Sequence, residues 1–146
     1  MYFEGEYLDG KKWNGKIYNL EDNKISEIKN GTIEYIKEYD IEGDLKYEGK
    51  YINGIKSGYG KLYEKIKYRG NILIFEGEFL DGKIWNGKGR YYSEEGIEFE
   101  GTYLNGRRWN GYYSEYDEYG DIIDSGKYIN GKFKSDKQAE EEEESE

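Results

Sequence analysis

The chain has 146 residues and a formal net charge of −10, with 18 tyrosines and 21 glycines but no proline, cysteine or histidine. The lack of cysteine excludes disulfides and thiolate chemistry, and the lack of histidine removes the commonest general base and metal ligand. Hydrophobic residues make up 35% and charged residues 37%, which is thin for a closed core yet too aromatic for a disordered chain. This composition favours a structure with much surface per residue.

The N-terminal segment has neither the basic start nor the apolar stretch of a signal peptide. No apolar run approaches the roughly 20 residues that a membrane-spanning helix needs. The sequence therefore predicts a cytoplasmic protein.

Residues 3–16 recur almost intact as residues 75–88, and in part as residues 99–111, 47–54 and 125–132. One glycine holds the same place in every copy: Gly5, Gly49, Gly77, Gly101 and Gly126. These glycines are 24 to 28 residues apart, except for a first step of 44 residues. Because that step is nearly twice the others, we expect a degenerate unit near residue 28.

Each copy has the pattern of a β-hairpin. Phe3, Gly5 and Tyr7 alternate with residues of another kind, which is the period of a strand with two different faces. Asn-Gly and Asp-Gly pairs accept positive φ, and nine of them begin at positions 9, 14, 30, 53, 81, 86, 105, 110 and 130. The pattern predicts an all-β chain of tandem hairpins that reverses direction at these pairs.

A glycine between two aromatic residues of one strand face needs a reason, because glycine weakens a strand. Gly5, Gly77 and Gly101 occupy this place. We expect an aromatic ring from the neighbouring strand to lie flat across the backbone at each of them.

These motifs resemble the MORN (membrane occupation and recognition nexus) repeat family, whose unit is about 23 residues long. Residues 75–79 with Gly82, Gly87 and Gly89 fit its glycine and aromatic pattern, and residues 47–54 with Gly58 and Gly60 fit equally well. The resemblance covers Tyr2 to about Lys132. It implies an elongated single-layer antiparallel sheet with one hairpin per repeat, here residues 1–134 with units starting near 3, 28, 47, 75, 99 and 125. The open sheet edges of such an array invite end-to-end pairing or a capping element.

Residues 135–146 lack apolar periodicity and are rich in glutamate. They predict an acidic disordered tail, which serves for solubility or attracts a basic partner.

No catalytic, cofactor or metal site emerges from the sequence. The carboxylate pairs recur with the repeat, whereas a catalytic pair is expected to be unique and enclosed. Asp117, Asp121 and Asp124 do not match a calcium loop and indicate a plain turn. A sequence pI near 4.7 opposes binding to nucleic acid. We therefore expect a protein that is not an enzyme and needs no cofactor.

Six aromatic residues are candidates for partner binding: Trp13, Trp85, Trp109, Tyr7, Phe79 and Tyr103. Exposed aromatics in a row make effective hot spots, but each Trp can instead pack on its own hairpin and the neighbouring repeat. The first hypothesis is a scaffold that binds a protein or peptide along this aromatic face, and a homodimer through sheet edges or faces is left open. The second is association with anionic lipid through Lys11, Lys12, Arg107 and Arg108, which the acidic charge disfavours. The third is an acidic inhibitor of the antitoxin or immunity type.

Overall fold

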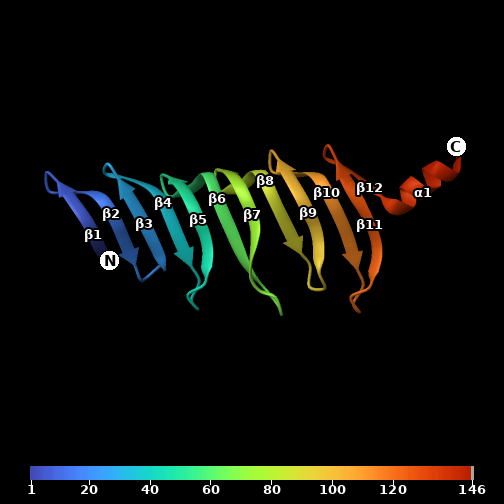
Figure 1. Cartoon of the computed structure of the whole chain (residues 1–146), viewed down its shortest axis with the longest axis horizontal. Helices are drawn as coiled ribbons and strands as arrows, with labels where there is room; N and C mark the ends of the chain where they lie inside the picture. Colours follow the sequence, from blue (N-terminus) through green and yellow to red (C-terminus); the bar gives the residue numbers. More distant parts are fainter. Residues whose placement is uncertain (146) are drawn as a thin grey trace.

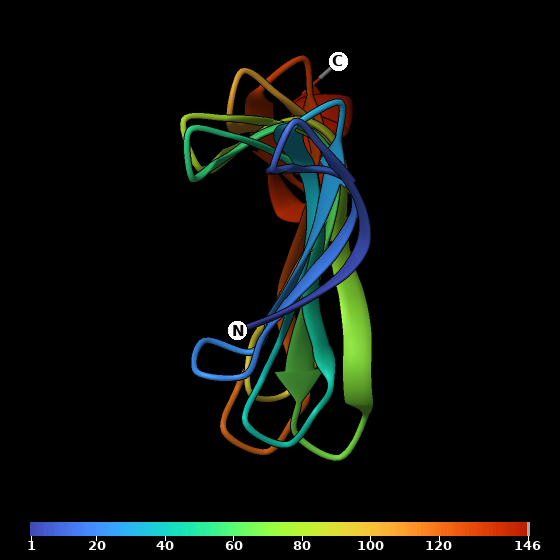
Figure 2. The same ribbon diagram turned by 90° about the vertical axis from the view of Figure 1, so that its left-hand side faces the viewer.

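A computed structural model, which describes residues 1–145, folds the chain into one open antiparallel sheet (Figure 1). The order of strands in the sheet is the order in the chain, so every strand pairs with its sequence neighbours. Seen from its end, the ribbon is one layer thick, with tight turns at one edge and longer loops at the other (Figure 2). The elements are β1 (Tyr2–Leu8), β2 (Lys11–Asn19), β3 (Lys24–Lys29), β4 (Thr32–Tyr39), β5 (Leu45–Ile52), β6 (Ile55–Ile66), β7 (Gly70–Leu80), β8 (Lys83–Tyr92), β9 (Ile97–Leu104), β10 (Arg107–Tyr116), β11 (Ile122–Ile129), β12 (Lys132–Ser135) and α1 (Asp136–Ser145).

Six two-residue turns close the hairpins at one edge of the sheet. The Asn or Asp of each turn has φ between 49° and 52°, and the following Gly has φ between 78° and 82°. Positive φ at both positions defines the turn that matches the twist of paired strands. The degenerate segment also forms a hairpin, β3–β4, closed at Asn30-Gly31.

Three of the nine Asn-Gly and Asp-Gly pairs do not reverse the chain, contrary to the prediction. The pairs that begin at Asn14, Asn86 and Asn110 lie inside β2, β8 and β10. Their glycines face the glycines of the preceding strand, and their asparagines contact the next hairpin, as described below.

Aromatic rings form the core on one face of the sheet. Tyr47, Phe75 and Phe99 are fully buried. Successive rings meet mainly edge to face, with centroids 5.2–5.8 Å apart, a geometry that aromatic pairs prefer. The series crosses the sheet from β5 to β12 and comprises Tyr51, Tyr47, Phe79, Phe75, Tyr103, Phe99, Tyr128 and Phe133.

Facing glycines make room for these rings. Gly77 on β7 faces Gly87 on β8, and a Cβ on Gly77 would lie 2.6 Å from the Cα of Gly87. A Cβ on Gly87 would lie 2.8 Å from Cζ of Phe75, so the ring lies against the backbone at Gly87. The same ring contact recurs at Gly15 with Phe3 and at Gly111 with Phe99.

The predicted position of the rings is therefore corrected. At Gly5, Gly77 and Gly101 a side chain would meet the backbone of the next strand, not a ring. In these three hairpins the ring belongs to the first strand and covers the glycine of the second strand. In the last hairpin the order is reversed, because Phe133 of β12 covers Gly126 of β11. Two strands that approach this closely leave no space for a Cβ between them.

Charged side chains alternate across the opposite face. Lys37, Glu48, Lys61, Glu76 and Lys88 stand directly opposite one another on five consecutive strands, β4 to β8. Opposite charges at directly facing positions stabilise a sheet, by roughly 0.2–1 kcal/mol for each pair. This face can therefore be exposed to solvent, and its facing charges still favour the observed register of the strands.

The C-terminal segment is helical where the sequence predicted a disordered tail. Helix α1 packs against β11 and β12, and the Ser125 hydroxyl donates a hydrogen bond to Asp136 (2.5 Å). Lys134 and Glu142 form an ion pair. Glutamate has a high helix propensity, and Asp136 in the first turn complements the helix dipole. These local preferences and contacts explain why order replaces the predicted disorder.

The facing glycines predict the effect of adding a side chain. Gly87→Val should lower the free energy of unfolding by about 3 kcal/mol, because the valine collides with the Phe75 ring and with the carbonyl oxygen of Glu76, 2.4 Å from the Cβ position. Lys88→Val is the control, since Lys88 is exposed on the same strand, and it should lower stability by about 1 kcal/mol at most, through loss of its pairing with Glu76. Urea unfolding of both variants measures the difference, and equal losses would contradict the account.

A core built from tyrosine predicts sensitivity to alkali. Burial raises the pKa of Tyr47 to about 12, from the ordinary value of 10.0 that the unfolded chain retains. Its contribution to stability is therefore complete below pH 10 and is lost as the pH rises towards 12. Absorbance of tyrosinate, followed with circular dichroism, should show late-titrating groups that ionise together with unfolding. Tyr47→Phe should remove one late group, and Tyr119→Phe, in an exposed loop, should leave the unfolding midpoint unchanged.

Candidate interaction surface

The three tryptophans are half-buried and contact the next hairpin. A Cβ on Gly31 would lie 3.2 Å from the Trp13 ring, and a Cβ on Gly131 would lie 3.0 Å from the Trp109 ring. The Trp85 ring lies beside Gly106 in the same way, at 3.7 Å. Each ring therefore packs on the turn glycine of the following repeat, which is the structural alternative raised from the sequence.

The backbone of each Trp and the side chain of the following Asn hold the same turn. The Trp85 carbonyl accepts a hydrogen bond from the Gly106 N–H (2.9 Å), and the side-chain oxygen of Asn86 accepts one from the Asn105 N–H (2.9 Å). The same two bonds, also 2.9 Å each, join Trp13 and Asn14 to Gly31 and Asn30, and Trp109 and Asn110 to Gly131 and Asn130. We call this pair of bonds the turn clamp. Its role was not predicted, although the constant Trp-Asn-Gly spacing from one turn to the next was a usable signal.

The six predicted binding aromatics do not form one exposed row. Phe79 is 4% exposed and Tyr103 is half-buried, and burial raises the pKa of Tyr103. Tyr7 is 62% exposed because, among residues 1–145, β1 is the outermost strand at its end of the sheet. The aromatic residues thus serve mainly to hold repeat to repeat.

One junction between hairpins has neither bond of the turn clamp. In β4, Glu34-Tyr35-Ile36 stands where three other units have Trp-Asn-Gly, and among residues 1–145 no such bond reaches the Asn53-Gly54 turn. The Gly82 turn keeps the backbone bond alone, from its N–H to the Lys56 carbonyl (2.9 Å). The paired register of β4 and β5 ends at Tyr35 and Lys50, and a groove of about 730 Å³ opens between the two hairpins beyond that point. The groove is lined partly by Ile33, Ile36, Tyr51 and Ile52.

A row of exposed aliphatic residues follows the turn edge. The residue just before the turn is Leu or Ile in five of the six hairpins, with 37–59% of its surface exposed. We call these residues the tip row: Leu8, Ile52, Leu80, Leu104 and Ile129. In the second hairpin Lys29 takes this place. The tip row was not among the predicted sites. A single exposed Leu at the end of a strand is common, and only the strand register shows that the five residues lie along one edge.

Basic residues accompany the tip row. Lys11, Lys83, Arg107 and Lys132 pair directly with Leu8, Leu80, Leu104 and Ile129, respectively. The next basic residues turn inward: Lys12 lies over the Phe3 ring at 5.5 Å and Arg108 over the Phe99 ring at 4.9 Å. Arg108 also forms an ion pair with Glu98 at 3.0 Å. Of the four cations predicted to meet lipid, only Lys11 and Arg107 are therefore exposed at the tips.

The opposite edge of the sheet is acidic. Four of its five loops, residues 20–23, 40–44, 93–96 and 117–121, carry two or three carboxylates and no basic residue. The fifth loop, residues 67–69, is basic. We call this side the loop edge. The charge of the ribbon is thus segregated between its two long edges.

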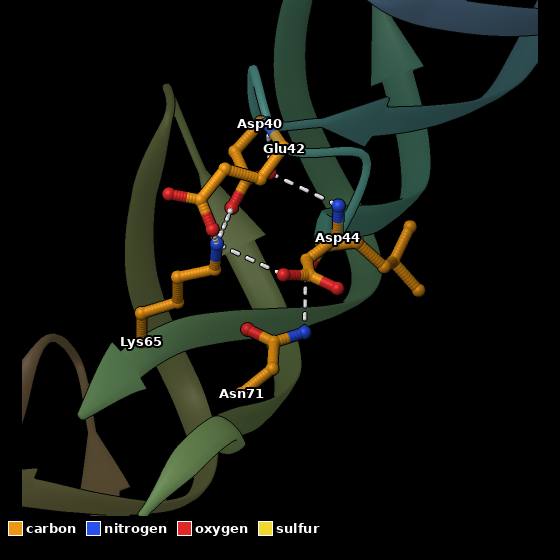
Figure 3. A network of polar contacts seen from close by, with 6 residues as sticks. Asp40, Glu42, Asp44, Lys65 and Asn71 are labelled. Carbon is orange, nitrogen blue, oxygen red and sulfur yellow. Dashed lines mark hydrogen bonds and ion pairs between the residues drawn. The ribbon is translucent and has the colours of Figure 1, made fainter. Parts of the chain in front are cut away.

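One ion-pair network joins loop 40–44 of this edge to Lys65, near the end of β6 (Figure 3). Lys65 Nζ lies 3.2 Å from Asp40 and 2.9 Å from Asp44, and it also pairs with Glu42. These carboxylates raise the pKa of Lys65. The N–H groups of Glu42 and Asp44 donate to Asp40, which lowers the pKa of that carboxyl. The network fixes the shape of an exposed loop.

The aspartates of loop 117–121 act in the same way. Asp117 accepts hydrogen bonds from the N–H groups of Tyr119 (2.9 Å) and Asp121 (3.0 Å). The carboxylate thereby holds a turn, as the sequence predicted. Among residues 1–145 no cluster of acidic side chains has the geometry of a metal site.

No model of a known protein family matches the chain, and no curated protein matches its sequence. The long sheet of consecutive hairpins is compatible with a MORN-like repeat. Within residues 1–145 no helix is long and apolar enough to cross a bilayer.

The turn clamp predicts local differences in hydrogen exchange. The amides of Asn105 and Gly106 should exchange more slowly than those of Asn53 and Gly54, which no clamp reaches. Asn86→Ala should speed exchange at Asn105 and lower the free energy of unfolding by about 1 kcal/mol. The Asn130 amide, held by Asn110, is an internal control. Equal rates at clamped and unclamped turns would contradict the assignment.

Proposed function

We propose that the chain is a non-catalytic protein-interaction module of the MORN-repeat type and that its partner lies along the tip row. The observation that carries this proposal is the exposed aliphatic residue repeated at five of six turns. Aligned apolar surface that remains exposed on a folded protein marks a contact site. The deepest rings of the aromatic face are buried by packing one repeat on another, so they are not available to a partner.

The spacing of the tip row favours a helical partner. Neighbouring strands lie about 4.8 Å apart, so successive tips recur about every 10 Å. Seven residues of an α-helix advance about 10.5 Å. A helix along the turn edge therefore offers one apolar side chain per heptad to each tip. The basic residues beside the row favour acidic residues flanking that apolar stripe.

Binding to an anionic membrane surface is a second candidate, favoured by the pairing of an exposed aliphatic residue with a cation at four tips. Such pairs suit the interface between lipid headgroups and acyl chains. The acidic loop edge and the glutamates of α1 weigh against it, because anionic lipid repels them.

The two candidates are separated by substitutions at the two edges. The tip variant carries Leu80→Ser and Leu104→Ser, and the control carries Ile41→Ser and Ile122→Ser in or beside the loop edge, where both isoleucines are exposed. Proteins captured from the source cells by wild type and by the control, but not by the tip variant, are then purified. Calorimetry with each purified protein should show binding weakened by about tenfold or more in the tip variant.

Sedimentation with vesicles containing 30% phosphatidylserine tests the second candidate with the same three proteins. If wild type and the loop-edge control bind these vesicles and the tip variant does not, lipid and not a protein is the partner of the tip row. Identical behaviour of the tip variant and the loop-edge control with every protein and vesicle would overturn the assignment of the tip row.

A further inference from the structure

The two ends of the sheet differ. Strand β12 has only four residues, and α1 packs against it at the C-terminal end (Figure 1). Strand β1 has seven residues, pairs only with β2, and has no other element of residues 1–145 beside its outer edge. A strand with a free edge offers unpaired N–H and C=O groups to another chain.

The junctions inside the array show what such an edge accepts. In the junction of β8 with β9, Gly89 faces Gly101, Arg90 faces Glu100 and Tyr91 faces Phe99. In the junction of β6 with β7, the corresponding facing residues are Gly60, Lys61 and Leu62. In the junction of β4 with β5, Lys37 faces Glu48 and Ile36 faces Gly49, so the basic residue recurs in all three junctions and the glycine in two. Each glutamate of this series thus meets a cation on the strand that precedes it.

The glycine of the preceding strand also has a physical reason. A Cβ on Gly89 would lie 2.9 Å from Cε2 of Tyr103, so the Tyr103 ring lies across the preceding hairpin at that glycine. Tyr7 is the residue of β1 that corresponds to Tyr103, and it is 62% exposed. A strand with glycine opposite Gly5 would let the Tyr7 ring close over it in the same way.

We propose that the outer edge of β1 binds an extended segment of another protein as an added antiparallel strand. The segment has the pattern Gly-(Lys/Arg)-(Leu/Tyr), with its glycine opposite Gly5, its cation opposite Glu4 and its apolar residue opposite Phe3. Strand β1 repeats the Phe-Glu-Gly series of β7 and β9, and Glu4 faces Lys16 on its inner side only. Backbone bonds supply the attachment, and the cation and the glycine supply selectivity.

A second copy of this chain fits the edge poorly. Two β1 strands paired antiparallel about Gly5 place Glu4 of each directly opposite Glu6 of the other. Like charges at facing positions destabilise a sheet. The outer edge of β1 therefore disfavours pairing with a second β1 strand and favours a strand that carries a cation.

The test uses the full chain and a labelled synthetic peptide copying residues 86–92, which contains Gly89, Arg90 and Tyr91 in the required order. Fluorescence anisotropy should show saturable binding, and amide NMR signals of β1 should shift. The same peptide with Arg90→Glu should bind about tenfold more weakly to wild type. The protein variant Glu4→Lys should reverse this preference, whereas Glu140→Lys, on α1 at the far end, should leave it unchanged.

Equal affinity of the two peptides for wild type, or an unchanged preference in Glu4→Lys, would overturn the proposal. Shifts confined to β7–β9 would also overturn it, because they would mean exchange with the native β8 strand. A dimer in light scattering that the peptide does not dissociate would assign the edge to a second copy. The tip variant should bind the peptide as wild type does, so this result and that for the tip row are independent.

Discussion

The close approach of facing glycines, covered by aromatic rings, is the constraint on which the rest of the structure depends. A single-layer sheet has no second layer to cover its apolar face, so it must bury that face against itself. The ring of Phe75 does this by lying across the backbone at Gly87, and the ring of Tyr103 lies across Gly89 of the preceding hairpin. One set of rings therefore ties the two strands of a hairpin together, and the other ties each hairpin to its neighbour.

This arrangement makes the array one-dimensional, since each hairpin depends only on the two beside it. A departure in one unit then stays local. In the degenerate hairpin Ile36 is buried and faces Gly49, where the junctions of β6 with β7 and of β8 with β9 pair two glycines. Ile28 is buried where other units place an aromatic ring. The apolar layer continues, but the turn clamp to the next hairpin is absent. Loss of the motif thus changes one junction and leaves the sheet continuous.

The sequence was sufficient to predict the fold class, because alternation and Asx-Gly turns are local and recur six times. It was insufficient where the answer lay in contacts between units. The Asn-Gly pair at Asn86 looks like the pair at Asn105, yet one lies within a strand and the other forms a turn, and only their mutual hydrogen bond distinguishes them. The burial of the predicted binding residues depends on the same contacts, since period-two patterning shows which face Phe79 shares but not that neighbouring rings bury it. The helix α1 was missed because tertiary contacts with β11 and β12 add to the propensity of a glutamate run.

When the apolar face of a sheet is buried by contacts within the sheet itself, the edges are the parts that remain accessible to other molecules. Here the edges are chemically distinct, although the chain as a whole is acidic. The turn edge combines aliphatic residues with cations, the loop edge gathers carboxylates, and the end strand β1 offers backbone groups beside Glu4. The net charge of the chain therefore does not describe the electrostatic potential at each edge. Salt screens charges that lie further apart than about a Debye length, roughly 8 Å at physiological salt, so nearby residues determine the potential at each edge. The tip residue is repeated along one edge, so a partner of the proposed kind would meet one extended surface, on which weak contacts at single tips add up.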